Sequence, residues 1–97
     1  MRTLVVVPTH NEADNVGTVL DDIVRQLPDA DVLVVDDDSD DGTRARVRGH
    51  PCFGERLRLL ERPTKLGLAS AYLEGFHVAL EEGYETVAEI DADRSHD

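Results

Sequence analysis

The chain has 97 residues, which is enough for one domain with a single core and too few for two. Hydrophobic residues make up 40% and charged residues 32%, the proportions of a folded globular protein and not of a disordered one. Ten Lys and Arg against 21 Asp and Glu give a net charge of −11, which repels nucleic-acid backbones and anionic lipid headgroups. Nucleic acid is therefore excluded as a partner, and a bare membrane surface is disfavoured.

The apolar runs are short, and the longest stay far below the roughly 20 residues that a membrane span requires. The residues after Met1 lack the pattern of a signal peptide. Cys52 is the only cysteine, so the chain cannot form an internal disulfide. These features are typical of a cytosolic protein.

The first two expected elements are a strand and a helix. Residues 4–7 are an unbroken run of leucine and valine that Pro8 closes, which predicts a strand buried on both faces of a sheet. From Asp14 the apolar residues recur three and four positions apart until Pro28, which predicts an amphipathic helix. The apolar residues of that helix are Val16, Val19, Leu20, Ile23, Val24 and Leu27.

Two further strands and a short helix are expected in the middle of the chain. Residues 31–35 predict a second buried strand, which ends at an acidic block over residues 36–41. A short helix is expected over residues 43–48, and a third strand over residues 57–60.

A third helix and a fourth strand complete the expected elements. The helix follows the turn at Gly67 and ends at Gly83, and residues 86–90 predict the strand. Because strands and helices alternate throughout, the chain is expected to have an α/β fold with about four parallel strands and flanking helices. The apolar series of this last helix is Ala69, Tyr72, Phe76, Ala79 and Leu80.

Polar clusters follow three of the predicted strands, at Pro8 to Glu12, at residues 36–41 and at Asp91 to Asp93. The carboxyl ends of parallel strands share one edge of a sheet, and ligands bind there at the point where the strand order reverses. A single polar loop is ordinary. Three clusters at one edge favour a binding site.

The acidic block carries five carboxylates in six positions, which repel one another unless a cation or hydrogen-bond donors offset their charge. Asp37, Ser39, Asp41 and Gly42 match the start of a calcium-binding loop, but Arg48 stands where such a loop needs a bidentate Glu. Calcium is thereby disfavoured. A solvated acidic turn remains the alternative to a ligand site.

Asp91 and Asp93 place two carboxylates on one side of an extended segment. Hard oxygen ligands of this kind suit Mg²⁺ or Mn²⁺ that bridges a diphosphate. The chain contains neither a GxxxxGK[ST] nor a GxGxxG loop, so phosphate would be bound through a metal. Arg62 and Lys65 either face phosphate or lie in solvent, and the sequence leaves both alternatives open.

Four segments together resemble family 2 glycosyltransferases, and among them the dolichol-phosphate (polyprenol-phosphate) mannosyltransferases. They occur in the order and at the spacing of that family. The segments are VVVPTHNE at residues 5–12, VVDDDSDDGT at 34–43, KLGLASAY at 65–72 and DADRSH at 91–96.

The resemblance implies a GT-A nucleotide-sugar fold, which is similar to the Rossmann fold, with residues 1–97 as its N-terminal half. It assigns Asp91, Asp93 and Ser95 to a Mg²⁺ or Mn²⁺ ion on the diphosphate, and it assigns no catalytic residue. The nucleotide-sugar site that it implies consists of Pro8, His10, Glu12, Val35, Asp37, Asp91, Ala92, Asp93 and Ser95.

The implied reaction is inverting transfer of mannose from GDP-mannose to a polyprenyl (dolichyl) monophosphate at the cytoplasmic face of a membrane. The metal would stabilise charge on the leaving diphosphate, and the acceptor phosphate, already an anion, would need no general base. The alternatives are a family member with another nucleotide-sugar and a catalytically incomplete nucleotide-binding fragment. A phosphatase of the haloacid dehalogenase type, with Asp36 and Asp38 as its carboxylates, would leave the cluster after the first strand without a role.

The sequence departs from the family pattern in two places. Residues 38–42 read DSDDG where Asn-Ser-Pro-Asp-Gly is usual, and Ala69 replaces a common second glycine; neither change removes an expected ligand. Family catalytic domains are roughly twice as long, so we expect an N-terminal fragment, inactive alone, of an enzyme whose acceptor site follows Asp97. A bare strand edge and an uncovered apolar helix face are then expected.

Overall fold

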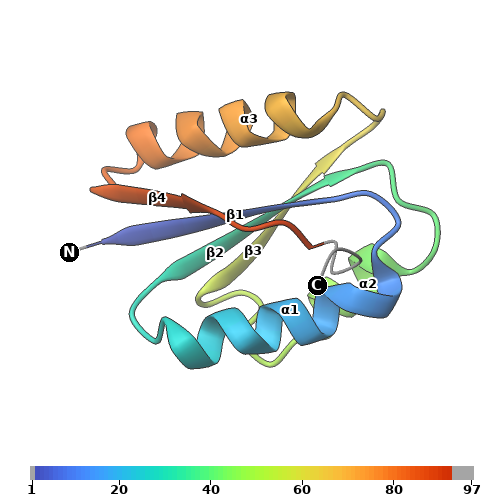
Figure 1. Ribbon diagram of the computed structural model, residues 1–97, viewed down its shortest axis with the longest axis horizontal. Coiled ribbons are helices and arrows are strands. Elements are labelled where there is room, and N and C mark those ends of the chain that lie inside the picture. The colour runs from blue at the N-terminus through green and yellow to red at the C-terminus, as the bar shows by residue number, and fades with distance from the viewer. Residues whose placement is uncertain (1, 93–97) are drawn as a thin grey trace.

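The computed structural model describes residues 2–92, which form a four-stranded parallel sheet with helices on both faces (Figure 1). Each predicted strand and helix is present, which confirms the expected α/β class. The elements are β1 (Thr3–Thr9), α1 (Ala13–Gln26), β2 (Asp31–Asp37), α2 (Thr43–Arg48), β3 (Leu57–Arg62), α3 (Leu68–Glu81) and β4 (Thr86–Glu89).

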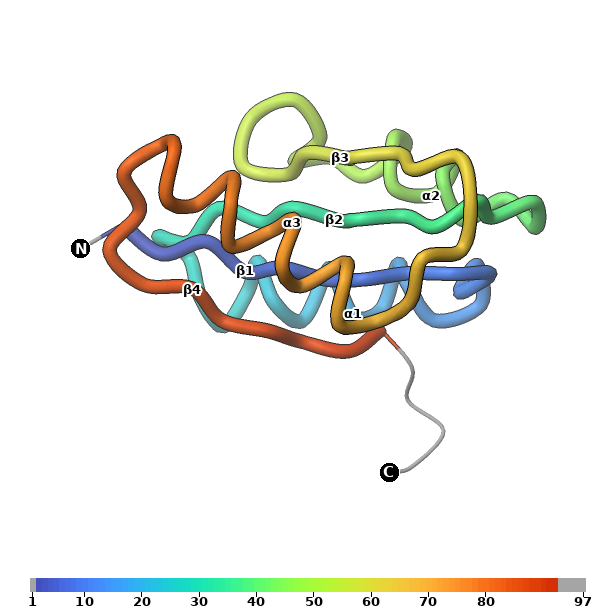
Figure 2. The backbone as a smooth tube through the Cα atoms, turned by 90° about the horizontal axis from the view of Figure 1, so that it is seen from above, coloured from blue at the N-terminus to red at the C-terminus, as the bar shows by residue number. Residues whose placement is uncertain are grey.

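The sheet has the strand order β3-β2-β1-β4, and Figure 2 shows this order from above. The chain builds outward from β1 to β3 on one side and then returns to place β4 on the other side of β1. The strand order therefore reverses between β1 and β4. In parallel sheets, the carboxyl ends of the strands at such a reversal form the usual ligand-binding crevice.

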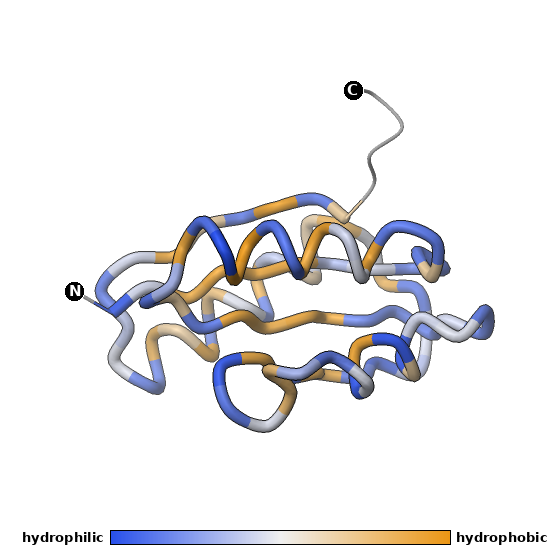
Figure 3. Tube along the Cα trace, turned by 90° about the horizontal axis from the view of Figure 1, so that it is seen from below, coloured by the Kyte–Doolittle hydropathy of each residue, from blue (hydrophilic) through white to orange (hydrophobic). Residues whose placement is uncertain are grey.

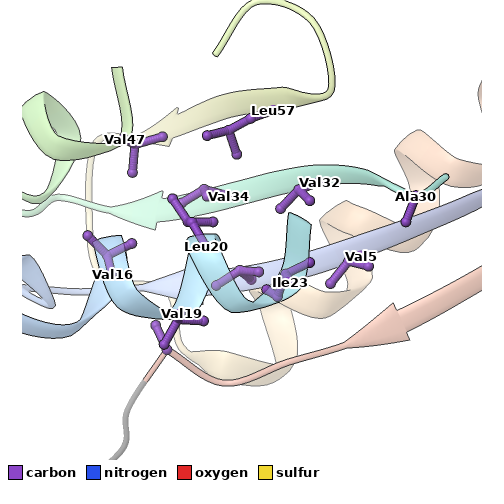
Figure 4. Packing of buried hydrophobic residues seen from close by; sticks show 12 residues of the cluster. Val5, Val16, Val19, Leu20, Ile23, Ala30, Val32, Val34, Val47 and Leu57 are labelled. Atoms are coloured by element: carbon purple, nitrogen blue, oxygen red, sulfur yellow. The ribbon is translucent and has the colours of Figure 1, made fainter. Parts of the chain in front are cut away.

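One face of the sheet is covered by α1, whose hydrophobic and hydrophilic residues alternate along the helix (Figure 3). Its buried residues pack onto the valines of β1 and β2 that point to this face (Figure 4). Four of the six predicted residues are thus confirmed on the inner face of α1, whereas Val24 is half-buried and Leu27 is 40% exposed and lies beyond the end of the helix. The buried members of this cluster on α1, β1 and β2 are Val16, Val19, Leu20, Ile23, Val5, Val7, Val32 and Val34.

The opposite face is covered by α3, and here the predicted inner face was wrong in part. The buried residues of α3 are Ala71, Gly75 and Ala79, whereas Leu80 is 77% exposed. A Cβ atom built on Gly75 would lie 2.5 Å from both Cγ atoms of Val6, so the helix approaches the sheet too closely for a larger residue. Among the other predicted inner residues, Ala79 is buried, Tyr72 is half-buried, and Ala69 and Phe76 are exposed.

The outer surface of α3 carries large exposed apolar side chains, among them Leu73 and Phe76. β4 lies at an edge of the described sheet. These two features agree with the expected bare edge and uncovered apolar helix face. Within residues 2–92, no helix has both the length and the apolar character needed to cross a membrane.

Candidate functional site

A cleft of about 230 Å³ opens at the carboxyl ends of the strands. The segment after β1 forms one wall, the end of β2 and the start of α3 form the other, and Asp91 enters after β4. All three predicted polar clusters contribute to the cleft, which confirms that they share one edge of the sheet. The lining residues are Pro8, Thr9, His10, Glu12, Asp37, Lys65, Gly67, Leu68, Ala71 and Asp91.

Asp37 is a buried carboxylate of the cleft that is held by several donors. Arg62 donates two parallel hydrogen bonds to it, from Nε to Oδ1 at 2.6 Å and from Nη2 to Oδ2 at 3.0 Å. The backbone amides of Leu66 and Gly67 also donate to Oδ2. Burial alone would raise the pKa of Asp37, but the bonds from Arg62 and these amides outweigh it and hold the pKa below its ordinary value.

Asp36 is fully buried and points to the opposite face of β2. It accepts hydrogen bonds from the Thr9 hydroxyl at 2.6 Å, from Nε of Arg44 at 2.6 Å and from Ser39. Burial raises the pKa of Asp36, yet these donors outweigh that effect and leave the pKa below its ordinary value. Asp36 is buried and does not line the cleft, which disfavours the phosphatase alternative.

Asp41 of the acidic block is also held by donors from the protein, whereas Asp38 and Asp40 are exposed. Asp41 accepts bonds from the amide of Ala13 at 3.1 Å and from Thr43, and the Thr43 bond is the main reason for its lowered pKa. The block therefore joins α1 and α2 to the ends of β1 and β2. In the described part of the chain, no group of three His, Cys, Asp or Glu side chains is placed to hold a metal ion, so a calcium loop is absent there.

His10 lies against the cleft with a fixed ring. Its Nδ1 atom is 2.6 Å from the carbonyl oxygen of Asp37. Because a carbonyl only accepts hydrogen bonds, Nδ1 carries a proton and donates. In the neutral ring, Nε2 is then an acceptor.

Asp91 lines the cleft after β4, close to Tyr72 of α3. Burial raises the pKa of the Tyr72 hydroxyl, and the negative charges of Asp91 and Glu89 raise it further. The hydroxyl therefore stays protonated at neutral pH and can act as a hydrogen-bond donor near the carboxylate.

The structure brings five of the expected site residues to the cleft and places two others in the core. Val35 and Ala92 are fully buried, and neither lines the cleft. Asp93 and Ser95 lie outside the described residues. The five residues at the cleft are Pro8, His10, Glu12, Asp37 and Asp91.

Sequence reasoning missed the partner of Asp37. Arg62 was expected to face phosphate or solvent, but its side chain is 6% exposed and bound to Asp37. The signal lies in the pairing of β2 with β3, where Asp37 and Arg62 are register partners. Of the two cations near Pro63, Lys65 is the one that lines the cleft.

A parallel sheet with this strand order and a polar cleft at its point of reversal defines an open α/β fold of the kind that binds ligands at the carboxyl ends of its strands. The sequence profile described as Glycosyl transferase family 2 matches residues 4–97, and the chain belongs to this family.

Two relatives and one solved structure show where the similarity lies. The chain is 42% identical over 96 residues to an undecaprenyl-phosphate mannosyltransferase of Micrococcus luteus, an alignment that covers 99% of this chain and 40% of the relative. It is 41% identical over 96 residues to a polyprenol monophosphomannose synthase of Mycolicibacterium smegmatis, with 98% and 36% covered. The chain therefore spans less than half the length of either relative.

The structure is similar to the mannosyltransferase PcManGT of Pyrobaculum calidifontis, which was solved in complex with GDP-Man and Mn²⁺. The TM-score is 0.75 at 37% sequence identity, over 95% of this chain and 27% of the other. The expected GT-A fold is thereby confirmed.

Proposed function

We propose that this chain forms the donor-binding part of a metal-dependent mannosyltransferase that uses GDP-mannose and a polyprenyl monophosphate. The cleft at the reversal point of the sheet carries this proposal, since it gathers Pro8, His10, Glu12, Asp37 and Asp91 from three separate segments. These are positions that the family resemblance assigns to the nucleotide-sugar. The names of the two relatives and the GDP-Man bound by PcManGT support mannose as the sugar.

In this proposal the two ends of the cleft bind different parts of the donor. Pro8, His10, Glu12 and Asp37 bind the nucleoside, and Asp91 holds a divalent ion on the diphosphate together with Asp93 and Ser95. Val35 and Ala92 have buried side chains, so any contact from them comes from backbone atoms.

The described part of the ion site is compatible with Mn²⁺ or Mg²⁺, because Asp91 offers hard carboxylate oxygens at an exposed position in the cleft. When bound, such an ion stabilises negative charge on the leaving diphosphate. Mn²⁺ in the PcManGT complex supports a divalent ion here.

The proposed transfer proceeds with inversion, and the acceptor phosphate supplies the attacking oxygen as an anion. Residues of this chain then have to orient the donor and need not remove a proton. Because the proposed acceptor is a lipid, the proposed place of action is the cytoplasmic face of a membrane.

Isothermal titration calorimetry of the chain with GDP-mannose tests the proposal. We expect saturable binding with Mn²⁺, loss of at least about tenfold in affinity with EDTA, and weaker binding of UDP-glucose. Preference for UDP-glucose would support a glycosyltransferase of another sugar instead. Absence of nucleotide binding with either ligand would overturn the donor site.

A further inference from the structure

We infer that Arg62 is a positioning residue of the nucleotide cleft, which it shapes through Asp37 without lining the cleft itself. This inference rests on the proposed function, because it assigns the cleft to a nucleotide. From the sequence, Arg62 was expected either to contact phosphate or to lie in solvent.

Arg62 lies beneath the wall of the cleft and donates mainly to that wall; its Nη1 atom also lies 3.9 Å from a carboxylate oxygen of Glu74 in α3. Nε and Nη2 hold the two oxygens of Asp37, and Nη1 donates to the Ser70 hydroxyl at 2.9 Å. Nη2 also approaches the carbonyl oxygen of Gly67 at 3.4 Å. The planar guanidinium thus joins the end of β2 to the first turn of α3, a geometry that an ammonium group cannot reproduce.

The same carboxylate fixes the segment that precedes α3. Oδ2 of Asp37 accepts from the amides of Leu66 at 3.0 Å and Gly67 at 3.2 Å, in addition to Arg62. Gly67 and Lys65, two residues before it, line the cleft. Loss of Arg62 would therefore release both Asp37 and the backbone that presents this wall.

The pairing also leaves one oxygen of Asp37 with free acceptor capacity. Oδ2 carries three donors, whereas Oδ1 carries one, from Arg62. Each carboxylate oxygen has two lone pairs, so the three donors share those of Oδ2, whereas Oδ1 keeps one lone pair unused. Oδ1 can therefore take one further donor, the kind of group that the N–H edge of a nucleobase offers.

Arg62 also changes the charge that the donor meets. Three carboxylates line the cleft, from Glu12, Asp37 and Asp91, and a nucleoside diphosphate is itself an anion. The buried guanidinium offsets the charge of Asp37 from behind the wall. It thus lowers the repulsion toward the nucleotide while leaving the cleft open.

Arg58 provides a matched control on the same strand. It forms a two-pronged pair with Glu82 at 3.0 and 2.9 Å, and neither residue lines the cleft. Arg58→Met removes a two-pronged arginine–carboxylate pair from the other end of β3, where the two side chains are 40% and 41% exposed instead of buried. It reports what the loss of such a pair does without any change at the wall.

The experiment measures GDP-mannose affinity with Mn²⁺ for wild type, Arg62→Met, Arg62→Lys and Arg58→Met, together with the folded fraction of each by urea denaturation. We expect Arg62→Met to weaken binding by the folded chain at least about tenfold, Arg62→Lys to lose several-fold and Arg58→Met to bind as wild type. The ¹H–¹⁵N resonances of Leu66 and Gly67 should shift in both Arg62 variants and stay in place in Arg58→Met.

Wild-type affinity of the folded Arg62 variants would overturn the inference, as would an affinity loss that the unfolded fraction explains completely. Should Arg62→Met fail to fold because it leaves a buried carboxylate unpaired, Arg62→Lys, which keeps the positive charge, decides by the same criteria. Failure of the wild-type chain to bind would overturn the proposed function and this inference with it. Normal wild-type binding with unaffected variants would overturn this inference alone.

Discussion

Asp36 and Asp37 are adjacent residues whose carboxylates do different work, because successive side chains of a strand point to opposite faces of the sheet. Asp36 continues the face of Val32 and Val34 and binds Thr9, Ser39 and Arg44. Asp37 continues the face of Leu33 and Val35 and meets the start of α3. One carboxylate therefore braces the loops behind the site, and the other shapes the wall of the cleft.

Asp36→Asn is expected to lower the free energy of unfolding at pH 7 by about 2–4 kcal/mol, because it disrupts a buried group with several charge-assisted bonds. The pKa of Asp36 is lowered in the fold, so the stabilisation by its ionised form is complete above the unfolded-state pKa and is lost as pH falls through the folded-state value. The difference between wild type and variant should therefore shrink below about pH 4. Urea denaturation across this range measures it, and a difference that stays constant would contradict the charge argument.

Asp91→Ala is expected to weaken GDP-mannose binding in the presence of Mn²⁺ at least about tenfold, because it removes a proposed ion ligand. With EDTA, wild type and variant should bind alike, since the ion is absent from both. Asp40→Ala is the control, because Asp40 is an exposed carboxylate that does not line the cleft. Calorimetry that finds the same affinity for Asp91→Ala and wild type in Mn²⁺ would remove Asp91 from the site.

At the scale of elements, α3 shows how a small residue sets the distance between a helix and a sheet. Gly75 sits on Val6, and the flanking inner residues Ala71 and Ala79 are also small. The close approach brings the start of α3 to the carboxyl end of β2, where Gly67 and Ala71 line the cleft. The short distance between α3 and the sheet thus helps to position the residues that line the cleft.

Gly75→Ala is expected to destabilise the chain by about 1–3 kcal/mol, although alanine is the better helix former. The added methyl group would meet the fully buried and β-branched Val6, which has little room to turn. Gly17→Ala in α1 is the matched control, since nothing lies within 4 Å of its Cβ position, and it should stabilise by about 0.5–1 kcal/mol. Thermal and urea denaturation of both variants measure the change in the free energy of unfolding, which should have opposite signs in the two. A stabilising Gly75→Ala would contradict the close contact between Gly75 and Val6.

At the scale of the whole molecule, the two faces of the sheet have different surroundings. The face of the sheet that α1 covers is buried in a cluster of larger aliphatic residues. On the other side, the outer surface of α3 exposes Leu73, Phe76 and Leu80 to solvent. Large exposed apolar side chains that lie along one helix favour association with other apolar surfaces. Association of the chain in solution is therefore expected to depend on this surface.

The double substitution Leu73→Gln and Leu80→Gln is expected to reduce self-association of the chain at high concentration. Both side chains are largely exposed, at 67% and 77%, so the free energy of unfolding should change by less than about 0.5 kcal/mol per residue. Sedimentation velocity over a range of concentrations measures the association. An unchanged sedimentation profile would show that this surface does not drive it.

The sequence by itself determined the order and type of the elements, because hydrophobic periodicity is a local property of consecutive residues. It also determined that three polar clusters share one edge, since parallel strands align their carboxyl ends, and the four family segments carried the family assignment. These inferences need no knowledge of which residues face one another across the fold.

Only the tertiary structure decided which residues pair across elements. The contact of Arg62 with Asp37 depends on the register between β2 and β3, and the inner face of α3 depends on how closely that helix approaches Val6. Periodicity placed Phe76 and Leu80 on the inner face of α3, but the residues that the narrow space above the sheet buries are Ala71, Gly75 and Ala79. Distances between strands and helices are set by packing of the whole core, and a single sequence carries no direct measure of them.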